Sequence, residues 1–529
     1  LGVACAGQSK YSEAVKWFDA AHRLDPSDLS TLIGKSSALH KMGQSDAALD
    51  VYRSIETSVS SDAFALFNKG VILSESGHKY EAEIAYREAL NFDPDNSDCL
   101  NNLASLLSQK SRFDEAEILL SKAIAIAPHD FNVNLNYCSY LEGANRLEES
   151  QTVIDNFLGR DRGNSDALYM KGKLLGRQGR YDEAANLFEE LLPKPLSDDI
   201  RYQISMEYGY ALDQLGRAED AFNTFSTANN LNKSSDAGQQ IDAHKFVNYV
   251  RQLKNSVTQF DPNQFVNIPE YEYGELCFFV GFPRSGTTLM EQILASRKGV
   301  LTTKEQSPLM ALKSDLLRDF GVEQENLPSR IFNFSGEEIR QAQALFKDHA
   351  DRLLEMDTQG LHLVDKLPLN ITELWLVQSL FPNARVIVAI RDPRDVVLSC
   401  FMQRFELNIA MINFCDVQAS AELYADVMNL WRLYKEHTKL RWMEYKYEEL
   451  VTQFTGTTQR VFAFLDLAWS DEIIHFQDSI DSRSVSTPSY RSVTAPINNK
   501  AIGRWRKYEK NLNLVMETLE PFLPEYGFS

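Results

Sequence analysis

A strand-to-helix loop in the second half of the chain carries the residue types that bind phosphate. The apolar run 276–280 is followed by Gly281-Phe282-Pro283-Arg284-Ser285-Gly286-Thr287-Thr288. A glycine-bounded turn that opens a helix presents free backbone N–H groups and the positive end of the helix dipole. In the ordinary nucleotide-binding loop a lysine follows the second glycine and the next Ser or Thr binds magnesium. Here Thr287 replaces that lysine and Arg284 supplies the cation, so the loop predicts anion binding but not an ordinary nucleotide hydrolase.

A second candidate anion site follows the apolar run 384–390. Its residues are Arg391-Asp392-Pro393-Arg394-Asp395, and the predicted helix after them bears Ser399 and Arg404. An arginine at a strand end and a serine two turns along a helix form a natural clamp for a terminal phosphate. We expect Asp395 to cap this helix. A surface Arg–Asp cluster that only caps the helix is the alternative for this loop taken alone.

The second half of the chain predicts an α/β domain with a central parallel sheet. Short β-rich runs alternate with longer amphipathic stretches, at Leu276–Val280, Leu361–Val364, Arg385–Ile390 and Trp442–Tyr447. This alternation is typical of βαβ units. Both candidate loops fall at the carboxyl ends of predicted strands, where such sheets bind their ligands.

The first half of the chain is a repeat array. Two series of small residues recur every thirty-four positions, at Ala14, Ala48, Ala82, Ala116, Ser150 and Ala184, and at Ser36, Gly70, Ala104, Cys138 and Gly172. Both series slip by three at Gly209 and Ala221. Small residues at matched positions let paired helices approach closely, and the pattern resembles the tetratricopeptide repeat. It predicts an α/α superhelix that exposes an extended surface for a protein, a peptide or a second copy of the chain (a homodimer); a spacer that only stabilises its neighbour is the alternative.

The repeat pattern and the α/β pattern together predict the domain organisation. We expect tetratricopeptide repeats over 1–232, a linker over 233–272 with a helical stretch to about Leu253, and the α/β domain over 273–529.

The α/β domain resembles the sulfotransferases that use 3′-phosphoadenosine 5′-phosphosulfate, above all the tyrosylprotein sulfotransferases and the repeat-bearing bacterial enzymes. The loop 283–288 and the Arg–Asp loop match in order and context. The resemblance implies a 5′-phosphosulfate site and a 3′-phosphate site. Their residues would be Arg284, Ser285, Gly286, Thr287 and Thr288 for the first and Arg391 and Ser399 for the second.

The same resemblance implies the catalytic residues. Glu305, twenty-one positions after Arg284, stands where the family has its general base. Arg284, Lys366 and Ser489 would stabilise the transferring group. The remaining nucleotide contacts would come from Tyr447, Asn498 and Arg504. At the position where the tyrosylprotein enzymes have another arginine this chain has Gln403, and whether the next residue, Arg404, replaces that arginine stays open.

The acceptor and the rival functions stay open. The Glu-Thr-Arg segment of the tyrosine-modifying enzymes is absent after Lys304, which argues against a tyrosine acceptor. We expect an acceptor hydroxyl or amine whose identity the sequence leaves open, and we hypothesise that the repeats help to bind it on a protein, a peptide or a glycan. A sulfuryl group carries less negative charge in transfer than a phosphoryl group, so we expect no metal. The alternatives are a magnesium-dependent P-loop kinase or nucleoside triphosphatase, and a repeat scaffold with an inactive transferase domain.

Composition limits the partners further. A net charge of −20 and a pI near 5.0 exclude a general affinity for nucleic acid or an anionic membrane surface. Six scattered cysteines favour reduced thiols and a cytoplasmic protein. No apolar run is long enough to span a membrane. Because the chain begins at Leu1, we make no prediction about a preceding signal or anchor.

Overall fold

The computed structural model describes residues 1–26, 28–55, 62–110, 112–258, 269–321, 323, 326–479 and 497–529. Contacts between Cα atoms group the chain into two compact units, Leu1–Gln178 and Gly179–Ser529.

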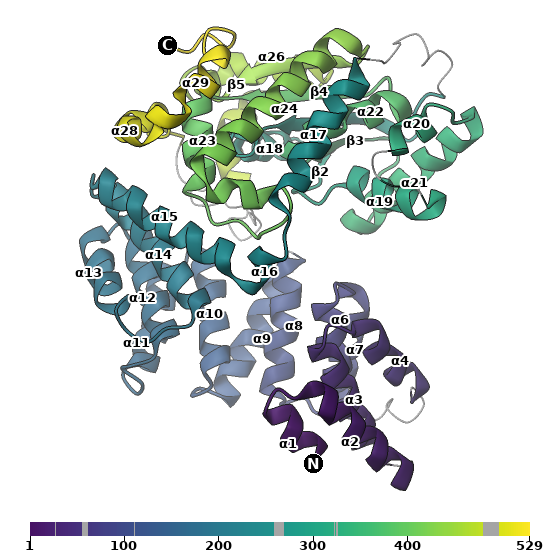
Figure 1. Cartoon of the computed structure of the whole chain (residues 1–529), viewed down its shortest axis with the longest axis vertical. Coiled ribbons are helices and arrows are strands. Elements are labelled where there is room, and N and C mark those ends of the chain that lie inside the picture. Colours follow the sequence, from purple (N-terminus) through teal and green to yellow (C-terminus); the bar gives the residue numbers. More distant parts are fainter. Residues whose placement is uncertain are drawn as a thin grey trace. The chain divides into compact units, whose positions relative to one another are not determined.

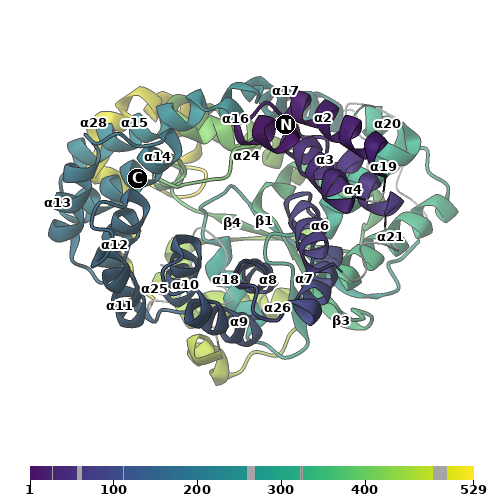
Figure 2. The ribbon, with the colours of Figure 1, turned by 90° about the horizontal axis from the view of Figure 1, so that it is seen from below.

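The first unit is a series of antiparallel helix pairs, as the thirty-four-residue pattern predicts. Neighbouring helices lie side by side in both ribbon views (Figures 1 and 2). The helices are α1 (Gly2–Gly7), α2 (Tyr11–Leu24), α3 (Leu29–Lys41), α4 (Ser45–Ser54), α6 (Ala63–Glu75), α7 (Lys79–Phe92), α8 (Ser97–Gln109), α9 (Phe113–Ile126), α10 (Phe131–Gly143), α11 (Leu147–Leu158) and α12 (Ser165–Arg177).

The two small-residue series face each other inside these pairs. The Ser36 hydroxyl donates to the Ala48 carbonyl at 2.8 Å, and the Ser150 hydroxyl donates to the Cys138 carbonyl at 2.9 Å. A Cβ built at Gly70 would lie 2.6 Å from the Tyr86 ring, so only glycine fits there without a shift. The prediction that small residues permit close helix contact is confirmed.

A second periodic signal, which the sequence analysis did not use, starts every other helix. An Asp or Asn stands at each N-cap and its side chain accepts a backbone N–H of the first turn. These caps are also thirty-four residues apart, at Asp28, Asp62, Asn96, Asp130 and Asn164.

The second unit contains a five-stranded parallel sheet in the order β2-β3-β1-β4-β5. The strands are β1 (Gly274–Gly281), β2 (Val300–Thr302), β3 (Leu361–Lys366), β4 (Arg385–Ile390) and β5 (Arg441–Lys446). The predicted α/β fold is confirmed, although the three-residue strand β2 was not predicted. Alternate residues of β1 enter two separate apolar clusters, Phe278 in one and Phe279 in the other, so both faces of the sheet are covered.

The other elements of this unit are helices and short 3₁₀ segments, and Figure 1 labels several of the helices around the sheet. After β1 they are α18 (Thr287–Ala295), α19 (Pro308–Phe320), α20 (Leu327–Ile331), α21 (Gly336–Leu354), η2 (Pro368–Glu373), α22 (Leu374–Leu380), α23 (Pro393–Phe401), η3 (Met411–Cys415), α24 (Val417–His437), α25 (Tyr447–Thr452), α26 (Phe454–Phe464), η4 (Asp471–Ser479), η6 (Arg504–Tyr508), α28 (Glu509–Leu512), η7 (Asn513–Val515), α29 (Met516–Leu519) and η8 (Glu520–Phe522).

The last repeat-type helices belong to the unit that holds the sheet. These are α13 (Tyr181–Leu191), α14 (Asp198–Gln214) and α15 (Ala218–Ser234), followed by α16 (Asp236–Gln239) and α17 (Ala243–Val257). Asp213 of α14 pairs with Arg504, and the Asn229 amide of α15 donates to the Phe401 carbonyl at 2.9 Å. The predicted boundary at 232 follows the repeat pattern, whereas the division by packing lies at Gly179. Within the predicted linker, α17 packs on α24, and residues 259–268 lie outside the described chain.

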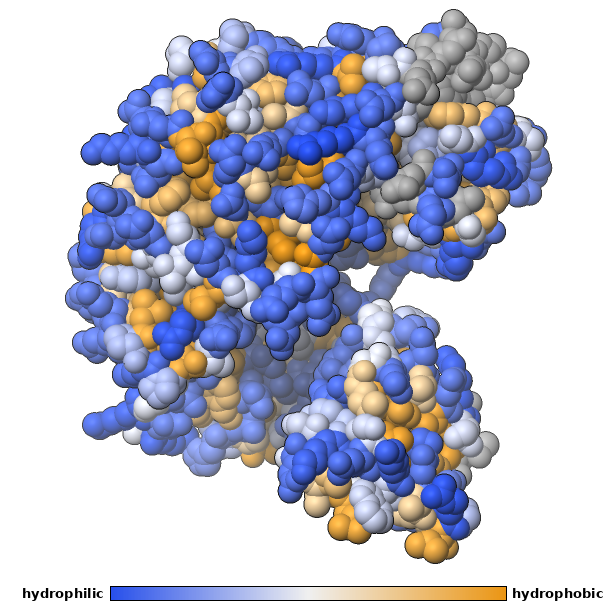
Figure 3. Space-filling model, viewed as in Figure 1, coloured by the Kyte–Doolittle hydropathy of each residue, from blue (hydrophilic) through white to orange (hydrophobic). Residues whose placement is uncertain are grey.

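The described helices and one face of the surface bear on membrane contact. Within the described ranges, no helix combines the length and the apolar character that crossing a bilayer requires. The face drawn in Figure 3 is mostly hydrophilic, with hydrophobic residues in small groups.

The close contact at Gly70 yields a stability prediction. Gly70→Ala places a methyl group against Tyr86, and overpacking of ~1–3 kcal/mol outweighs a gain of up to ~1 kcal/mol in helix propensity. Gly176 is a helical glycine with open space around its Cβ position, so Gly176→Ala should gain helix propensity without overpacking. Chemical unfolding followed by circular dichroism should show a lower midpoint for the first variant and an equal or higher one for the second. A Gly70→Ala protein as stable as Gly176→Ala would contradict this packing.

Candidate active site

The candidate residues gather at one edge of the sheet. Because all strand pairs are parallel, the carboxyl ends of β1, β3, β4 and β5 open on the same edge. The loop 282–286 follows β1, Lys366 ends β3, Arg391 follows β4 and Tyr447 follows β5. Glu305 follows the short strand β2, which pairs with β3.

The loop after β1 has the backbone of an anion cradle. Gly286 is the N-cap of α18 with a left-handed φ of 90°, and no side chain caps this helix. A Cβ at Gly286 would lie 2.4 Å from the Tyr447 ring, so glycine is needed there. Arg284 also has a positive φ of 70°, which a non-glycine residue adopts only when its surroundings impose it. The buried side chains of Ser285, Thr287 and Thr288 complete the loop.

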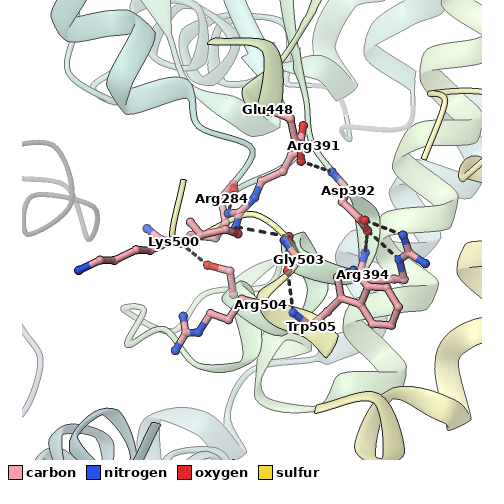
Figure 4. A network of polar contacts seen from close by, with 12 residues as sticks. Arg284, Arg391, Asp392, Arg394, Glu448, Lys500, Gly503, Arg504 and Trp505 are labelled. Atoms are coloured by element: carbon pink, nitrogen blue, oxygen red, sulfur yellow. Dashed lines mark hydrogen bonds and ion pairs between the residues drawn. The ribbon is translucent and has the colours of Figure 1, made fainter. Parts of the chain in front are cut away.

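Arg391 joins this loop to the second one. Its guanidinium donates to the carbonyl of Arg284 at 3.0 Å and to the carbonyl of Ala501 at 2.6 Å (Figure 4). The same group lies 4.9 Å from the centre of the Tyr447 ring. The side chain is buried, and its Nε has no hydrogen-bond partner among the described residues.

Arg284 and Ser399 are in direct contact. The Arg284 Nε donates to the Ser399 hydroxyl, which lies on α23, at 3.1 Å. Burial, helped by the positive charges of Arg391 and Arg504, lowers the pKa of Arg284 to about 10. A bound anion would relieve this repulsion, because it would compensate the buried guanidinium groups.

Lys366 lies between two carboxylates. Its ammonium is 2.7 Å from Glu305 Oε1 and 2.8 Å from Glu291 Oε2. The side chains of Lys366 and Glu291 are buried, whereas that of Glu305 is 32% exposed. Burial raises the pKa of Glu291, and the charge of Lys366 opposes this rise. Glu305 is therefore the member of this group that faces solvent.

Glu291 is a site residue that the sequence analysis missed. It lies on α18, one turn after Thr288, in the mostly apolar and buried stretch Leu289–Leu294. An acid in the buried face of a helix is the signal that could have identified it, because such a group needs a partner.

The backbone holds Glu305 in an uncommon conformation. Lys304 and Glu305 have positive φ values of 49° and 68°. The Glu305 N–H donates to the Lys366 carbonyl at 3.1 Å, and the Lys304 N–H donates to Glu291 at 3.1 Å. Two consecutive left-handed residues cost about 1–3 kcal/mol each, so these contacts must compensate the strain.

Asp365 supports the same segment from behind. It accepts the Ser307 hydroxyl at 2.9 Å and the Leu309 N–H at 3.2 Å, and the Asn370 amide donates to Ser307 at 2.8 Å. Ser307 is the N-cap of α19, so this cluster fixes the start of the helix two residues after Glu305.

The four remaining predicted nucleotide or catalytic residues are Arg504, whose charge acts on Arg284, and Arg404, Asn498 and Ser489. The Arg504 guanidinium pairs with Asp213 at 2.8 Å, and Arg404 lies beyond the end of α23, exposed, with its guanidinium 5.9 Å from the Tyr202 ring. The exposed Asn498 accepts the Lys500 N–H at 3.1 Å. Ser489 lies outside the described residues. The roles assigned to these residues stay predictions.

The expectation for Asp395 was wrong. Asp392 is the N-cap of α23 and accepts the Arg394 N–H at 2.9 Å. Asp395 instead accepts the N–H groups of Gly503 and Trp505 at 2.7 and 2.8 Å, and so ties the C-terminal segment to the second loop. Capping belongs to the residue before the first helical turn, and Pro393 already occupies that turn.

Comparisons with known proteins agree with the repeat pattern of the first half and with the α/β pattern of the second half. Residues 277–471 match the model of the sulfotransferase family, and residues 65–96, 85–118, 139–200 and 169–228 match tetratricopeptide-repeat models. The chain combines tetratricopeptide repeats with a sulfotransferase-family domain.

The relatives are distant. A protein of Aquifex aeolicus whose name gives no activity is 26% identical over 64% of this chain and 44% of its own length. The protein-tyrosine sulfotransferase of Drosophila melanogaster is 27% identical over 46% of this chain and 49% of its own length. Protein-tyrosine sulfotransferase A of Caenorhabditis elegans is 26% identical over 47% of this chain and 66% of its own length. The chain therefore spans about half the length of the first two. A solved tetratricopeptide repeat protein from Parabacteroides merdae is 16% identical, with a TM-score of 0.38, over 45% of this chain and 93% of its own.

A cavity opens beside the cluster in the sulfotransferase domain. Its volume is about 420 Å³, and Arg284, Thr287, Thr288 and Glu305 are among its lining residues. Within the described part of the chain, no group of three or more His, Cys, Asp or Glu side chains is arranged to hold a metal ion.

Asp365 generates a pH prediction for the sulfotransferase domain. Burial raises the pKa of Asp365 from the ordinary value of 3.8 to about 7. Between these values the folded protein holds a proton that the unfolded chain has released, so the contribution of Asp365 to the free energy of unfolding falls as the pH rises from about 4 to about 7. The slope is at most about 1.4 kcal/mol per pH unit.

Asp365→Asn mimics the protonated acid and should flatten this part of the pH profile of stability, measured by chemical unfolding at several pH values. Asp319→Asn, at a side chain that is 53% exposed, is the control and should keep the wild-type slope. Parallel profiles for wild type and Asp365→Asn would show that Asp365 is ionised in the folded protein.

Proposed function

We propose that this chain is a sulfotransferase that moves a sulfuryl group from 3′-phosphoadenosine 5′-phosphosulfate to an acceptor hydroxyl or amine. One observation carries the proposal: the guanidinium of Arg391 in the second loop bonds to the carbonyl of Arg284 in the first. Two anion-binding loops in contact at one sheet edge suit a ligand with two phosphates on one ribose. The carboxylate of Glu305 lines the cavity that the first loop opens on.

The residues present fit the donor nucleotide. The first turn of α18 offers backbone N–H groups without a capping side chain, next to Arg284, for the 5′ end. Arg391 and Ser399 offer a guanidinium and a hydroxyl for the 3′-phosphate, and the orphaned Nε of Arg391 is a buried donor that an anion would satisfy. When bound, the donor supplies the sulfuryl group.

The chain's own residues would then move one proton and hold the charge. Glu305 takes the proton from the acceptor hydroxyl, since its carboxylate is the exposed member of the Glu291–Lys366–Glu305 group. When the proton reaches Glu305, the carboxylate loses its charge, and the ammonium of Lys366 turns toward the oxygens of the sulfuryl group in transfer. Glu291 keeps Lys366 in place throughout, and Arg284 compensates the charge from the side of the first loop.

Two substitutions separate binding from chemistry. Arg391→Ala should lower the affinity for 3′,5′-adenosine bisphosphate by about 10-fold or more, because a charged hydrogen bond is lost. Glu305→Gln should keep that affinity and lower turnover by about 10²- to 10⁴-fold, because the base is lost. Titration calorimetry and transfer of labelled sulfate measure the two effects.

The control is Arg318→Ala, which removes the same charge at a side chain that is 69% exposed and should change neither quantity. If the Arg391→Ala protein does not fold, Ser399→Ala tests the same 3′-phosphate site with a smaller change and should also lower the affinity for the bisphosphate. Turnover that requires magnesium and ATP would instead support the kinase or triphosphatase, and bisphosphate binding without turnover on any acceptor would support the inactive scaffold.

We also propose that the repeats of the first unit bind a protein or peptide partner, and the structure defines the truncation that isolates them. Removing residues 1–178 leaves α14 and α15, with Asp213 and Asn229, in the unit that holds the site. This variant should keep the wild-type affinity for the bisphosphate and lose the partner. Removing residues 1–232 deletes Asp213, which pairs with Arg504 and accepts the Tyr508 hydroxyl at 2.8 Å, so it should lower the melting temperature and the affinity for the bisphosphate. Equal behaviour of the two truncations would contradict the division at Gly179.

A further inference from the structure

The cavity beside Glu305 extends far beyond the two anion loops. Besides the loop residues, it is lined by side chains of α17, α19, η2 and the segment 405–411. Most of them are apolar, among them Phe246, Met310, Leu317, Leu367, Leu369 and Phe405. An apolar cleft of this size with a few polar groups is typical of a small-molecule site.

The charged side chains of this lining already have partners of opposite charge or belong to the transfer machinery. Lys313 and Glu373 form an ion pair of 2.8 Å with side chains only 4% and 3% exposed. The Tyr249 hydroxyl accepts from Lys313 at 2.9 Å and donates to Glu373 at 2.8 Å. The Lys313 ammonium also lies 4.5 Å from the centre of the Tyr249 ring. This buried trio carries no net charge.

The cavity therefore disfavours an acceptor with carboxylates. Arg284 belongs to the loop that would hold the donor, and Lys313 is committed to Glu373. The remaining charge is the carboxylate of Glu305, backed by Glu291 behind Lys366. A carboxylate on the acceptor would be buried near the Glu305 carboxylate, and the nearby ammonium of Lys366 already pairs with Glu305 and Glu291, so its burial is costly.

We propose, as an extension of the proposed function, that this cavity selects an uncharged hydroxyl compound with an apolar ring body, such as a phenol. The rings of Phe246, Tyr249 and Phe405 suit an aromatic body. In the transfer, the acceptor oxygen forms a bond to sulfur and its proton passes to Glu305. The bond from sulfur to the bridging oxygen of the 5′-phosphate breaks, and its electron pair stays on that oxygen.

A matched pair of acceptors tests the selection on the full chain. With labelled donor, 2-naphthol should be sulfated with a kcat/KM at least about 30-fold above that of 6-hydroxy-2-naphthoate, which differs by one added carboxylate. Placing that carboxylate near the carboxylate of Glu305 should cost about 2 kcal/mol or more, which corresponds to this ratio.

A charge placed in the wall should change this preference. Leu317→Arg adds a cation on α19 and should narrow the ratio at least about 10-fold, since each 1.4 kcal/mol is tenfold. Leu514→Arg, at a side chain that is 77% exposed and outside the cavity lining, is the matched control and should leave the ratio unchanged.

The outcomes separate this inference from the function on which it rests. Equal or better use of the naphthoate, transfer to a tyrosyl peptide but not to 2-naphthol, or a ratio that Leu317→Arg does not move would overturn the inference while the sulfotransferase function stands. Failure to bind 3′,5′-adenosine bisphosphate, measured in the same preparation, would overturn both.

Discussion

The bond from the Arg391 guanidinium to the Arg284 carbonyl is the contact on which the candidate site depends. With its second bond to Ala501, Arg391 holds together the loop after β1, the loop after β4 and the C-terminal segment. Asp395 strengthens the same junction by accepting two N–H groups of that segment. The parallel sheet makes this possible, because it opens the ends of β1 and β4, which pair directly, on one edge.

A balance of charge organises the other half of the site. Lys366 ends β3 with two carboxylates around its ammonium, one buried and one facing the cavity. The buried Glu291 comes from α18, the helix that the first loop opens, so one helix supports both the proposed anion site and, through Lys366, the proposed base. In the lining of the cavity the Lys313–Glu373–Tyr249 trio carries no net charge, so in our proposal Glu305 is the charged group that an acceptor meets.

Local sequence patterns predict much of this structure, but they do not predict contacts between residues that are distant in the chain. The glycine-bounded loop at 281–288, the strands around it and the thirty-four-residue repeats each have a signature within a few turns of chain. The pairing of Asp213 with Arg504 joins residues 291 positions apart and has no such signature, so the boundary at 232 followed the repeats and not the packing. Glu291 carries an acidic side chain in a mostly apolar helix, but its partner Lys366 is 75 positions away, so no local pattern joins the two. The cap of α23 was assigned to Asp395 because Asp392 and Asp395 are alike in sequence and differ only in position relative to the first turn.

A crystal structure of the chain with 3′,5′-adenosine bisphosphate tests the central claim most directly. The account predicts the 5′-phosphate against the backbone N–H groups of residues 285–288 and the 3′-phosphate within hydrogen-bond distance of Arg391 and Ser399, with Glu305 still facing the cavity. A nucleotide whose two phosphates both lie away from Arg391, or that binds outside the carboxyl edge of the sheet, would contradict it.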